Sequence, residues 1–532
     1  MGGKNLHWAD QTAENIIRER GERQEYTCAS GITPSGTVHI GNFREIMSVE
    51  LVVRALRDNG KNARFIYSWD DYDVFRKVPA NMPKPDELEA YLRFPITSVP
   101  DTSGRNENYA AHHEYDVETI LPEVGIHPEY LYQAKNYQAG LYATGMKLAM
   151  DNRKKLKDIL NTYRDENHKM QGEYWPVSVF CSSCKKDTTS VDGWDNDWTL
   201  HYTCECGHSE DVDLRKTSIA KLGWRIDWPM RWKHEQVVFE PAGKDHHSQG
   251  GSFDTARLVS KEIYDWDAPV SFRYDFIGLK GLPGKMSSSK GKVVSLADVL
   301  QYYQPEVVRY MFAGTRPNTE FSISFDLDVI KIYEDYDKTE RIAYGVQKAK
   351  NEAVFEKQKR IYELSQVKPI TKGASLKPEK IPFQVPFRHL CNILQINSGN
   401  IDEALKSFPD IKDFQIARFR QRCRCAWNWI TECAPEDFRF AVQGSDNKVN
   451  LSDVELNAIK NIRDNVLPAL EEKTEKELST ELYDVANFYE IEPKALFTAI
   501  YKVLIGKEQG PRLAGFMKVL GKGRLEKIFS NY

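Results

Sequence analysis

Two apolar segments flank a long amphipathic segment near the start of the chain, and this pattern restricts the fold more than any other sequence feature. The first segment, EYTCASGI, leads into a turn at Gly31. From Ile46 to Leu56, apolar residues then recur at helical spacing, and Asn59-Gly60 ends the pattern. The second segment, ARFIYSW, is almost continuously apolar, as strands covered on both faces are. Strand, helix and strand in this order predict a parallel α/β sheet.

The size and composition of the chain suit a multidomain globular protein. Its 532 residues, 41% of them hydrophobic and 28% charged, provide material for about two to four domains. No segment approaches the roughly 18 consecutive apolar residues of a membrane span, and the N-terminus MGGKNLHWAD lacks a hydrophobic signal region. We therefore expect a cytoplasmic protein with no membrane association. The net charge of −4 argues against general coating of nucleic acid, although it leaves room for a local basic surface.

Cysteines cluster in one part of the chain, as CSSC at Cys181 and Cys184 and as CECGH at Cys204 and Cys206. In a cytosolic enzyme this spacing favours a structural metal over disulfides. A CxxC turn places two thiolates on one side of a tetrahedral ion, and a second pair completes the site. The second pair is CxC, so His208 is an alternative ligand. We expect one structural Zn²⁺; the alternative is unligated thiols in a loop.

The pattern of segments predicts how the chain is divided. The α/β character stops near Pro79 and returns with EQVVFEPAGKDHH and PVSFRYDFIGLKG, and the sequence after about Ser322 is overwhelmingly helical. We therefore predict a doubly wound, Rossmann-type parallel sheet that is interrupted by a large insertion carrying the zinc knuckle, followed by an all-helical region. The expected parts are 1–95 and 236–325 for the two halves of the sheet domain, 96–235 for the insertion, 326–385 for a helical segment with a linker, and 386–532 for a last helical domain.

Three separate segments contain residues suited to binding a nucleotide. In TPSGTVHIGN, a glycine-bearing turn precedes a helix start, where unpaired N–H groups and the helix dipole attract phosphate. In GKDHHSQGG, Gly243 permits close approach and Asp245 is suited to ribose hydroxyls. GLKGLPGKMSSSKGKVVS places lysines and serines on glycine-flanked backbone, as a triphosphate requires when charge moves onto pyrophosphate. Taken singly, each has a simpler interpretation, such as a structural histidine or a solvated basic loop.

The segment SWDDYD offers acids for a cationic ligand. Asp70, Asp71 and Asp73 follow the strand ARFIYSW, where polar residues of a doubly wound sheet face the ligand crevice. Which of the three would pair with an ammonium group stays open. Sequence alone equally allows a ligand of arginine or glutamine size.

The pairing of HIGN with KMSSSK resembles the HIGH and KMSKS signatures of class I aminoacyl-tRNA synthetases. More narrowly, GITPSGTVHIGNFRE, WDDYDVFRKVP, GKDHHSQGGS and GKMSSSKG resemble class I lysyl-tRNA synthetases over most of residues 25–330. The resemblance implies a ligase that activates L-lysine with ATP and Mg²⁺ and transfers it to tRNA(Lys). It also implies that 1–95 and 236–325 are catalytic, that 326–385 contacts the tRNA stem and that 386–532 binds the anticodon. We expect a monomer whose lysine activation requires tRNA.

The same resemblance assigns residues to roles. His39 and Lys285 are expected to be catalytic; Lys290 joins them because Ser288 stands where the signature has its second lysine. Asn42 stands where the signature has its second histidine. The residues expected to bind ATP are Pro34, Ser35, Gly36, His39, Gly41, Asn42, Gly243, Asp245, Ile277, Lys285, Met286, Ser287 and Ser288. Those expected to bind lysine are Gly31, Thr33, Asp70, Tyr72, Trp224, His246 and Tyr274.

Rival functions remain at this level. A small-molecule nucleotidyltransferase shares the phosphate site but has no use for the long helical C-terminal part. A non-catalytic synthetase-like RNA-binding protein is disfavoured because His39, Asp245 and Lys285 are intact. A class I synthetase specific for another amino acid is a further alternative. The segment FQIARFRQRCRCAWNW mixes arginines with aromatic residues, which suits either direct contact with tRNA or ion pairing within a helical core.

Overall fold

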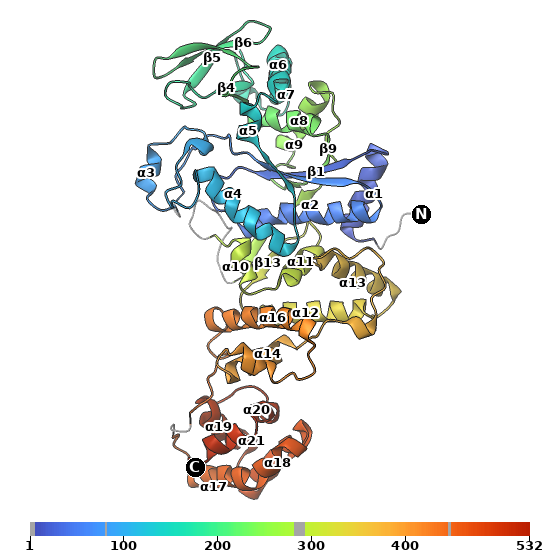
Figure 1. Cartoon of the computed structure of the whole chain (residues 1–532), viewed down its shortest axis with the longest axis vertical. Coiled ribbons are helices and arrows are strands. Elements are labelled where there is room, and N and C mark those ends of the chain that lie inside the picture. Colours follow the sequence, from blue (N-terminus) through green and yellow to red (C-terminus); the bar gives the residue numbers. More distant parts are fainter. Residues whose placement is uncertain (1–5, 80–81, 281–292, 445–447) are drawn as a thin grey trace. The chain divides into compact units, whose positions relative to one another are not determined.

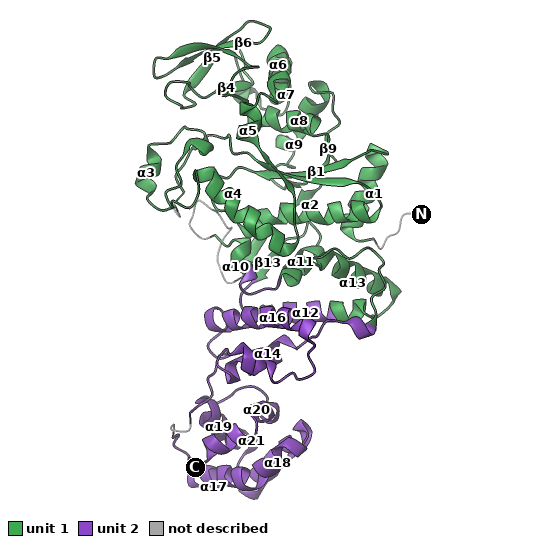
Figure 2. Cartoon of the chain, in the orientation of Figure 1, with its two compact units in different colours: residues 1–299, 305–323, 339–377 green, residues 300–304, 324–338, 378–532 purple. Residues whose placement is uncertain are grey.

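The computed structural model describes residues 6–79, 82–280, 293–444 and 448–532 (Figure 1). The chain divides into two compact units, shown in Figure 2. The first contains residues 1–299, 305–323 and 339–377, and the second contains 300–304, 324–338 and 378–532. Among the described residues, none of the helices is long and apolar enough to cross a membrane.

A four-stranded parallel sheet forms the centre of the first unit. Its strands are β1 (Tyr26–Ile32), β2 (Ala63–Trp69), β3 (Glu129–Tyr132) and β9 (Val237–Phe239), in the order β3-β2-β1-β9. The predicted parallel α/β sheet is thus confirmed. The chain runs from β1 outward to β2 and β3, whereas β9 returns on the other side of β1. The strand order therefore reverses between β1 and β9, where doubly wound sheets bind ligands at the carboxyl ends of their strands.

Helix α2 (Ile40–Asp58) connects β1 to β2 and packs against both strands. The helix is buried along most of its length, including Ile46, Val49, Val53 and Leu56. The turn after it contains Gly60 at a φ of 73°, a backbone conformation that glycine adopts without strain. The helix α1 (Trp8–Arg20) lies alongside α2.

The insertion contributes most of one hydrophobic core, which also includes Tyr72 and Val259 from outside it. Strand β4 (Val177–Val179) pairs antiparallel with β8 (Ala220–Leu222), and β5, β6 and β7 form an antiparallel meander. The other elements between β2 and β9 are α3 (Pro85–Glu89), α4 (Tyr109–Ile120), α5 (Gln133–Gln138), α6 (Ala143–Asp151), α7 (Arg153–Asn161), β5 (Thr189–Trp194), β6 (Thr199–Cys204), β7 (Ser209–Asp213) and α8 (Trp224–His234).

Short strand pairs and helices complete the first unit and lead into the second. Strand β10 (Ala242–Gly243) pairs with β11 (Arg273–Tyr274), and β12 (Ile277–Lys280) pairs with β13 (Phe321–Ser324). The helices of this stretch are α9 (Ser252–Glu262), α10 (Leu296–Leu300), α11 (Pro305–Ala313), α12 (Asp328–Ala343) and α13 (Glu352–Ser365).

Among the described residues that follow β13, all regular elements are helices, as predicted. In α16 (Asp413–Glu432), Arg422 is buried and binds both oxygens of Asp337 at 2.8 and 2.6 Å, whereas Arg424 is exposed. Part of the arginine-rich segment therefore forms core ion pairs. The other helices are α14 (Phe387–Ile396), α15 (Ile401–Leu405), α17 (Asp453–Asn461), α18 (Glu475–Phe488), α19 (Pro493–Ile505), α20 (Leu513–Leu520) and α21 (Lys522–Phe529).

Candidate active site

A cavity of about 410 Å³ lies at the carboxyl ends of β1 and β9, at the reversal of strand order. Strand β1 contributes its last residues to the cavity wall, and the segment after β9 contributes Glu240 to Ala242. Helix α2 adds Glu45, and α8 adds three tryptophans and Arg231. The site thus occurs where the topology of the sheet predicts it. Gly31, Thr33, Asp70, Trp224 and His246, five of the residues expected to bind lysine, line this cavity.

His39 caps helix α2 with its own side chain. The Gly41 N–H donates to Nδ1 of His39 at 3.0 Å, and the His39 N–H donates to Oδ1 of Asn42 at 3.2 Å. Because Nδ1 accepts a hydrogen bond, a neutral imidazole carries its proton on Nε2. Gly41 and Asn42 therefore fix the tautomer and the orientation of a donor at the helix start, where phosphate binds favourably.

The remaining residues expected to bind ATP come from three segments. Pro34, Ser35 and Gly36 form the turn before the helix, and the Ser35 carbonyl accepts a hydrogen bond from Tyr109 at 3.0 Å. Gly243 lies in β10, where a Cβ atom would meet the Tyr274 ring at 3.6 Å, and Asp245 follows that strand. Ile277 is buried in β12. The expected Lys285, Met286, Ser287, Ser288 and Lys290 lie outside the described residues.

A backbone hydrogen bond joins the start of helix α2 to the chain that follows strand β12. The Ile40 N–H donates to the Val294 carbonyl at 2.8 Å. Arg44, one helical turn further along, donates to the carbonyls of Phe276, Arg316 and Thr319 at 3.4, 2.8 and 2.7 Å. Segments far apart in the sequence thus meet at the start of α2.

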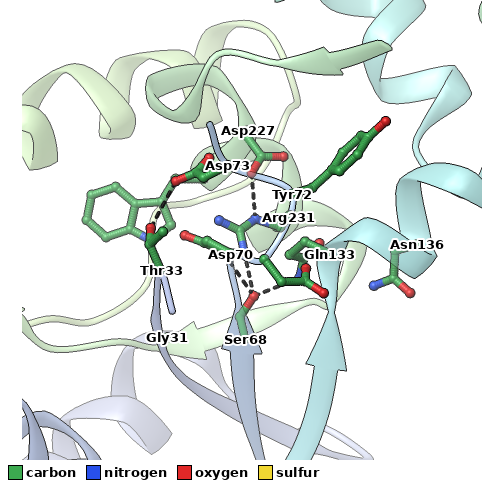
Figure 3. A network of polar contacts seen from close by, with 12 residues as sticks. Gly31, Thr33, Ser68, Asp70, Tyr72, Asp73, Gln133, Asn136, Asp227 and Arg231 are labelled. Carbon is green, nitrogen blue, oxygen red and sulfur yellow. Dashed lines mark hydrogen bonds and ion pairs between the residues drawn. The ribbon is translucent and has the colours of Figure 1, made fainter. Parts of the chain in front are cut away.

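Two tyrosines expected to bind lysine do not line the cavity. Tyr72 packs between Tyr137 and Phe180 in the core of the insertion, and its hydroxyl donates to the Ser218 carbonyl. Figure 3 shows its ring pointing away from Thr33 and Asp70. Tyr274 lies behind the cavity wall and donates its hydroxyl to Glu45. The expected contact with lysine therefore has no support for Tyr72, and for Tyr274 it becomes indirect through Glu45.

The acids of SWDDYD already have partners within the protein, and Figure 3 shows Asp70 beside Arg231. Asp70 pairs with Arg231 at 2.7 Å, and Asp73 pairs with Lys221 at 2.5 Å. Asp71 accepts a hydrogen bond from the Ala134 N–H at 2.7 Å, and burial raises its pKa to about 7. Each of the three acids therefore has at least one partner within the protein.

Three further acids that sequence reasoning missed line the cavity, and one of them, Glu235, pairs with Arg64 at 2.9 Å. Glu45 accepts hydrogen bonds from the Ser30 hydroxyl at 2.8 Å and from the Gly31 N–H at 3.3 Å, and burial raises its pKa. Glu240 accepts hydrogen bonds from the indoles of Trp228 and Trp232, and burial raises its pKa to about 7. Burial disfavours the ionised form of each carboxyl. A cation bound beside Glu45 and Glu240 would therefore stabilise both as carboxylates.

The four clustered cysteines converge as a metal site requires. Their sulfur atoms lie within 4.8 Å of one another, with Cys181 to Cys206 at 3.8 Å and Cys184 to Cys204 at 3.6 Å. Tetrahedral coordination with bonds of about 2.3 Å places thiolates about 3.8 Å apart, so the geometry fits one ion. His208 instead contacts Ser182 at 2.9 Å. These cysteines can hold a metal ion without it.

Comparison with known proteins gives consistent results. Residues 6–368 match the family model described as tRNA synthetases class I (K). The chain is 64% identical to a lysine–tRNA ligase of Treponema pallidum, over 99% of each chain. It is 52% identical to that of Borreliella burgdorferi, over 99% of this chain and 100% of the other. It is 39% identical to that of Pyrococcus horikoshii, over 97% and 98%.

Proposed function

Because the chain belongs to the class I (K) family of tRNA synthetases and is a lysine–tRNA ligase, we propose that the cavity between β1 and β9 holds the lysine that it activates. The observation that supports this most is the position of two acids, Glu45 and Glu240, in the wall of a cavity to which helix α2, capped by His39, contributes Glu45. Amino-acid and phosphate sites then adjoin, as the reaction requires.

The proposed chemistry depends on position. The lysine carboxylate attacks the α-phosphorus of ATP in line, and pyrophosphate leaves, so no protein nucleophile is needed. His39 donates from Nε2 to the phosphates, and the first N–H groups of α2 face the same charge. Mg²⁺ bound to the triphosphate would neutralise part of its charge. Transfer of the lysyl group to the 3′ end of tRNA(Lys) then releases AMP.

Recognition of the ε-ammonium of lysine is assigned to Glu45 and Glu240 in place of the acids of SWDDYD. The aliphatic stem of lysine would contact Trp224 and Trp228, which also line the cavity. A cation beside two carboxyls and flat aromatic walls is recognised both by charge and by the ring faces. A glutamine-sized neutral ligand would leave both carboxyls without a charged partner. This arrangement favours lysine over the neutral alternative.

The test is aminoacylation and ATP–pyrophosphate exchange across all amino acids, with and without tRNA. We expect charging of tRNA(Lys) with lysine, and lysine-dependent exchange only when tRNA is present, because docking of tRNA completes the site. Robust lysine-dependent exchange in RNA-free enzyme would refute only the requirement for tRNA and not the function. Absence of lysine charging would refute the function.

The second unit is proposed to bind tRNA. The exposed Arg424 of α16 and the exposed Phe414 at its start offer a cation and a ring face for phosphates and unstacked bases. Residues 386–532 would read the anticodon and 326–385 would contact the stem, as the family resemblance implies. We further propose a monomeric enzyme that acts in the cytoplasm, where ATP and tRNA are available.

The cysteine cluster is proposed to hold one structural Zn²⁺, because four thiolates leave no open position for substrate. Elemental analysis of protein purified without chelator should find one zinc per chain. Cys184→Ser should lose the ion. Its Tm should fall by about 5 °C or more, because a loss of roughly 1 kcal/mol in the free energy of unfolding lowers the Tm by about 2–4 °C in a domain of this size. Cys433→Ser, outside the cluster, is the matched control and should retain the zinc. Zinc-free wild-type protein would contradict the assignment.

A further inference from the structure

The two cations that pair with the acids of SWDDYD come from the end of the insertion, in β8 and α8. We propose that Lys221 of β8 is a positioning residue for the substrate's α-ammonium, an inference that rests on the proposed lysine site. It acts through Asp73, which it holds against the hydroxyl of Thr33 at the cavity wall. The cysteine-bearing insertion would thereby contribute to the affinity for the amino acid.

The contacts of Asp73 fix its carboxylate from two sides. Lys221 Nζ donates to Oδ1 at 2.5 Å and to the Tyr72 carbonyl at 3.1 Å, and the Thr33 hydroxyl donates to Oδ2 at 2.9 Å. Lys221 is only 8% exposed, and β8 is held by its pairing with β4. Each carboxylate oxygen thus has its own donor, and Figure 3 shows Thr33 and Asp73 joined in this way. The carboxylate is fixed in one orientation.

The arrangement presents acceptors to the cavity. Asp73 and Thr33 both line it, next to Gly31. The Thr33 hydroxyl uses its hydrogen on Asp73, so its oxygen can act only as an acceptor for a ligand. A primary ammonium has three donors and suits two such oxygens. Asp70 also lines the cavity and pairs with Arg231 in the same way, so a Lys221 variant tests the Asp73 side of the cavity alone.

Lys221 also keeps Asp73 ionised. Burial by itself would raise the pKa of this carboxyl, but the charge and hydrogen bond of Lys221, together with Thr33 and Arg231, lower it overall. Without Lys221, a carboxyl in this position would bind a proton more readily and could rotate away from Thr33. The α-ammonium would lose its charged acceptor, whereas the Glu45 and Glu240 side of the cavity would be unaffected.

The same contact has a simpler interpretation as a tie between the insertion and the sheet. An analogue separates the two. The compound 6-aminohexanoate keeps the carboxylate and the ε-ammonium of lysine and lacks only the α-ammonium. A positioning role predicts that loss of Lys221 weakens lysine and spares this analogue. A structural role predicts that both weaken together.

The experiment uses full-length enzyme with ATP and tRNA(Lys), and compares Lys221→Met, Lys221→Arg and the matched control Lys216→Met, an exposed lysine of the same insertion. In Lys221→Met we expect KM for lysine to rise about tenfold or more, with kcat and KM for ATP within about threefold. The inhibition constant of 6-aminohexanoate against lysine should stay within about twofold. Lys221→Arg should restore most of the affinity, and Lys216→Met should behave as wild type.

Several outcomes overturn the proposal: an unchanged KM for lysine, equal weakening of lysine and the analogue, or no rescue by arginine. If Lys221→Met does not fold, Asp73→Asn should give the same selective loss, and equal loss of both ligands would again refute the role. If wild-type enzyme does not charge tRNA with lysine, the proposed function fails instead.

Discussion

Glu45→Gln is expected to reduce kcat/KM for lysine by about 10- to 100-fold, because a hydrogen bond to a charged group contributes about 1.5–3 kcal/mol. Glutamine keeps the shape of Glu45 and its contact with Ser30, so the cavity should persist while its charge falls. KM for ATP should change little, since the phosphates bind at the helix start. Steady-state aminoacylation at varied lysine and varied ATP measures both quantities.

The matched control for this change is Glu22→Gln, an exposed acid that pairs with Lys61 at 2.7 Å. It should leave both KM values unchanged. Tyr274→Phe removes the hydroxyl that binds Glu45 and should give a smaller loss than Glu45→Gln. A Glu45→Gln effect under about threefold would show that the substrate ammonium is held elsewhere, with Glu240 as the remaining acid.

The signature loop should give the largest effect on the chemical step. Ser288 cannot neutralise phosphate, so Lys285 and Lys290 are assigned this charge. Cations directed at developing charge contribute about 3–4 kcal/mol, or roughly 10²–10³ in rate. Lys285→Ala and Lys290→Ala should each lower the rate of adenylate formation far more than they weaken lysine binding. Pre-steady-state quench-flow in the presence of tRNA measures that rate.

An internal control decides between the two lysines. If Lys290 only flanks the loop, Lys290→Ala will lower the rate less than about threefold while Lys285→Ala causes a large loss. Placing lysine at position 288 in the Lys290→Ala enzyme then tests what matters in the loop. Rescue by Ser288→Lys would show that total charge suffices, and no rescue would show that its exact position is required.

The sheet and its ligand edge could be predicted because their signals are local. The apolar strands around α2 and the helix start at His39 are each contained in a few neighbouring residues. Asp70 and Asp73 of SWDDYD line the cavity as expected, yet their partners Arg231 and Lys221 are remote in sequence. No spacing rule reveals an ion pair formed across the insertion, so the sequence could not indicate these partners.

Glu45 and Glu240 were not identified as site residues from the sequence, for related reasons. On an amphipathic helix, Glu45 is indistinguishable from a solvated residue until strand β1 is packed against it. Glu240 directly follows β9, and the strand-end rule applied to SWDDYD would have found it. The packing of Tyr72 could not be predicted, because its ring contacts Tyr137 and Phe180, which are distant in the chain.

The cap on helix α2 has a thermodynamic consequence for nucleotide binding. An imidazole on a loop would keep several rotamers, and a ligand would have to freeze them at a cost of about 0.5–1.5 kcal/mol. Here the hydrogen bond from Gly41 to Nδ1 restricts His39 as soon as the helix forms. The loss of rotational entropy thus belongs to folding, and ATP meets a donor that is already ordered. Affinity for the triphosphate should therefore fall in any variant that frays this helix end, even one that leaves His39 in place.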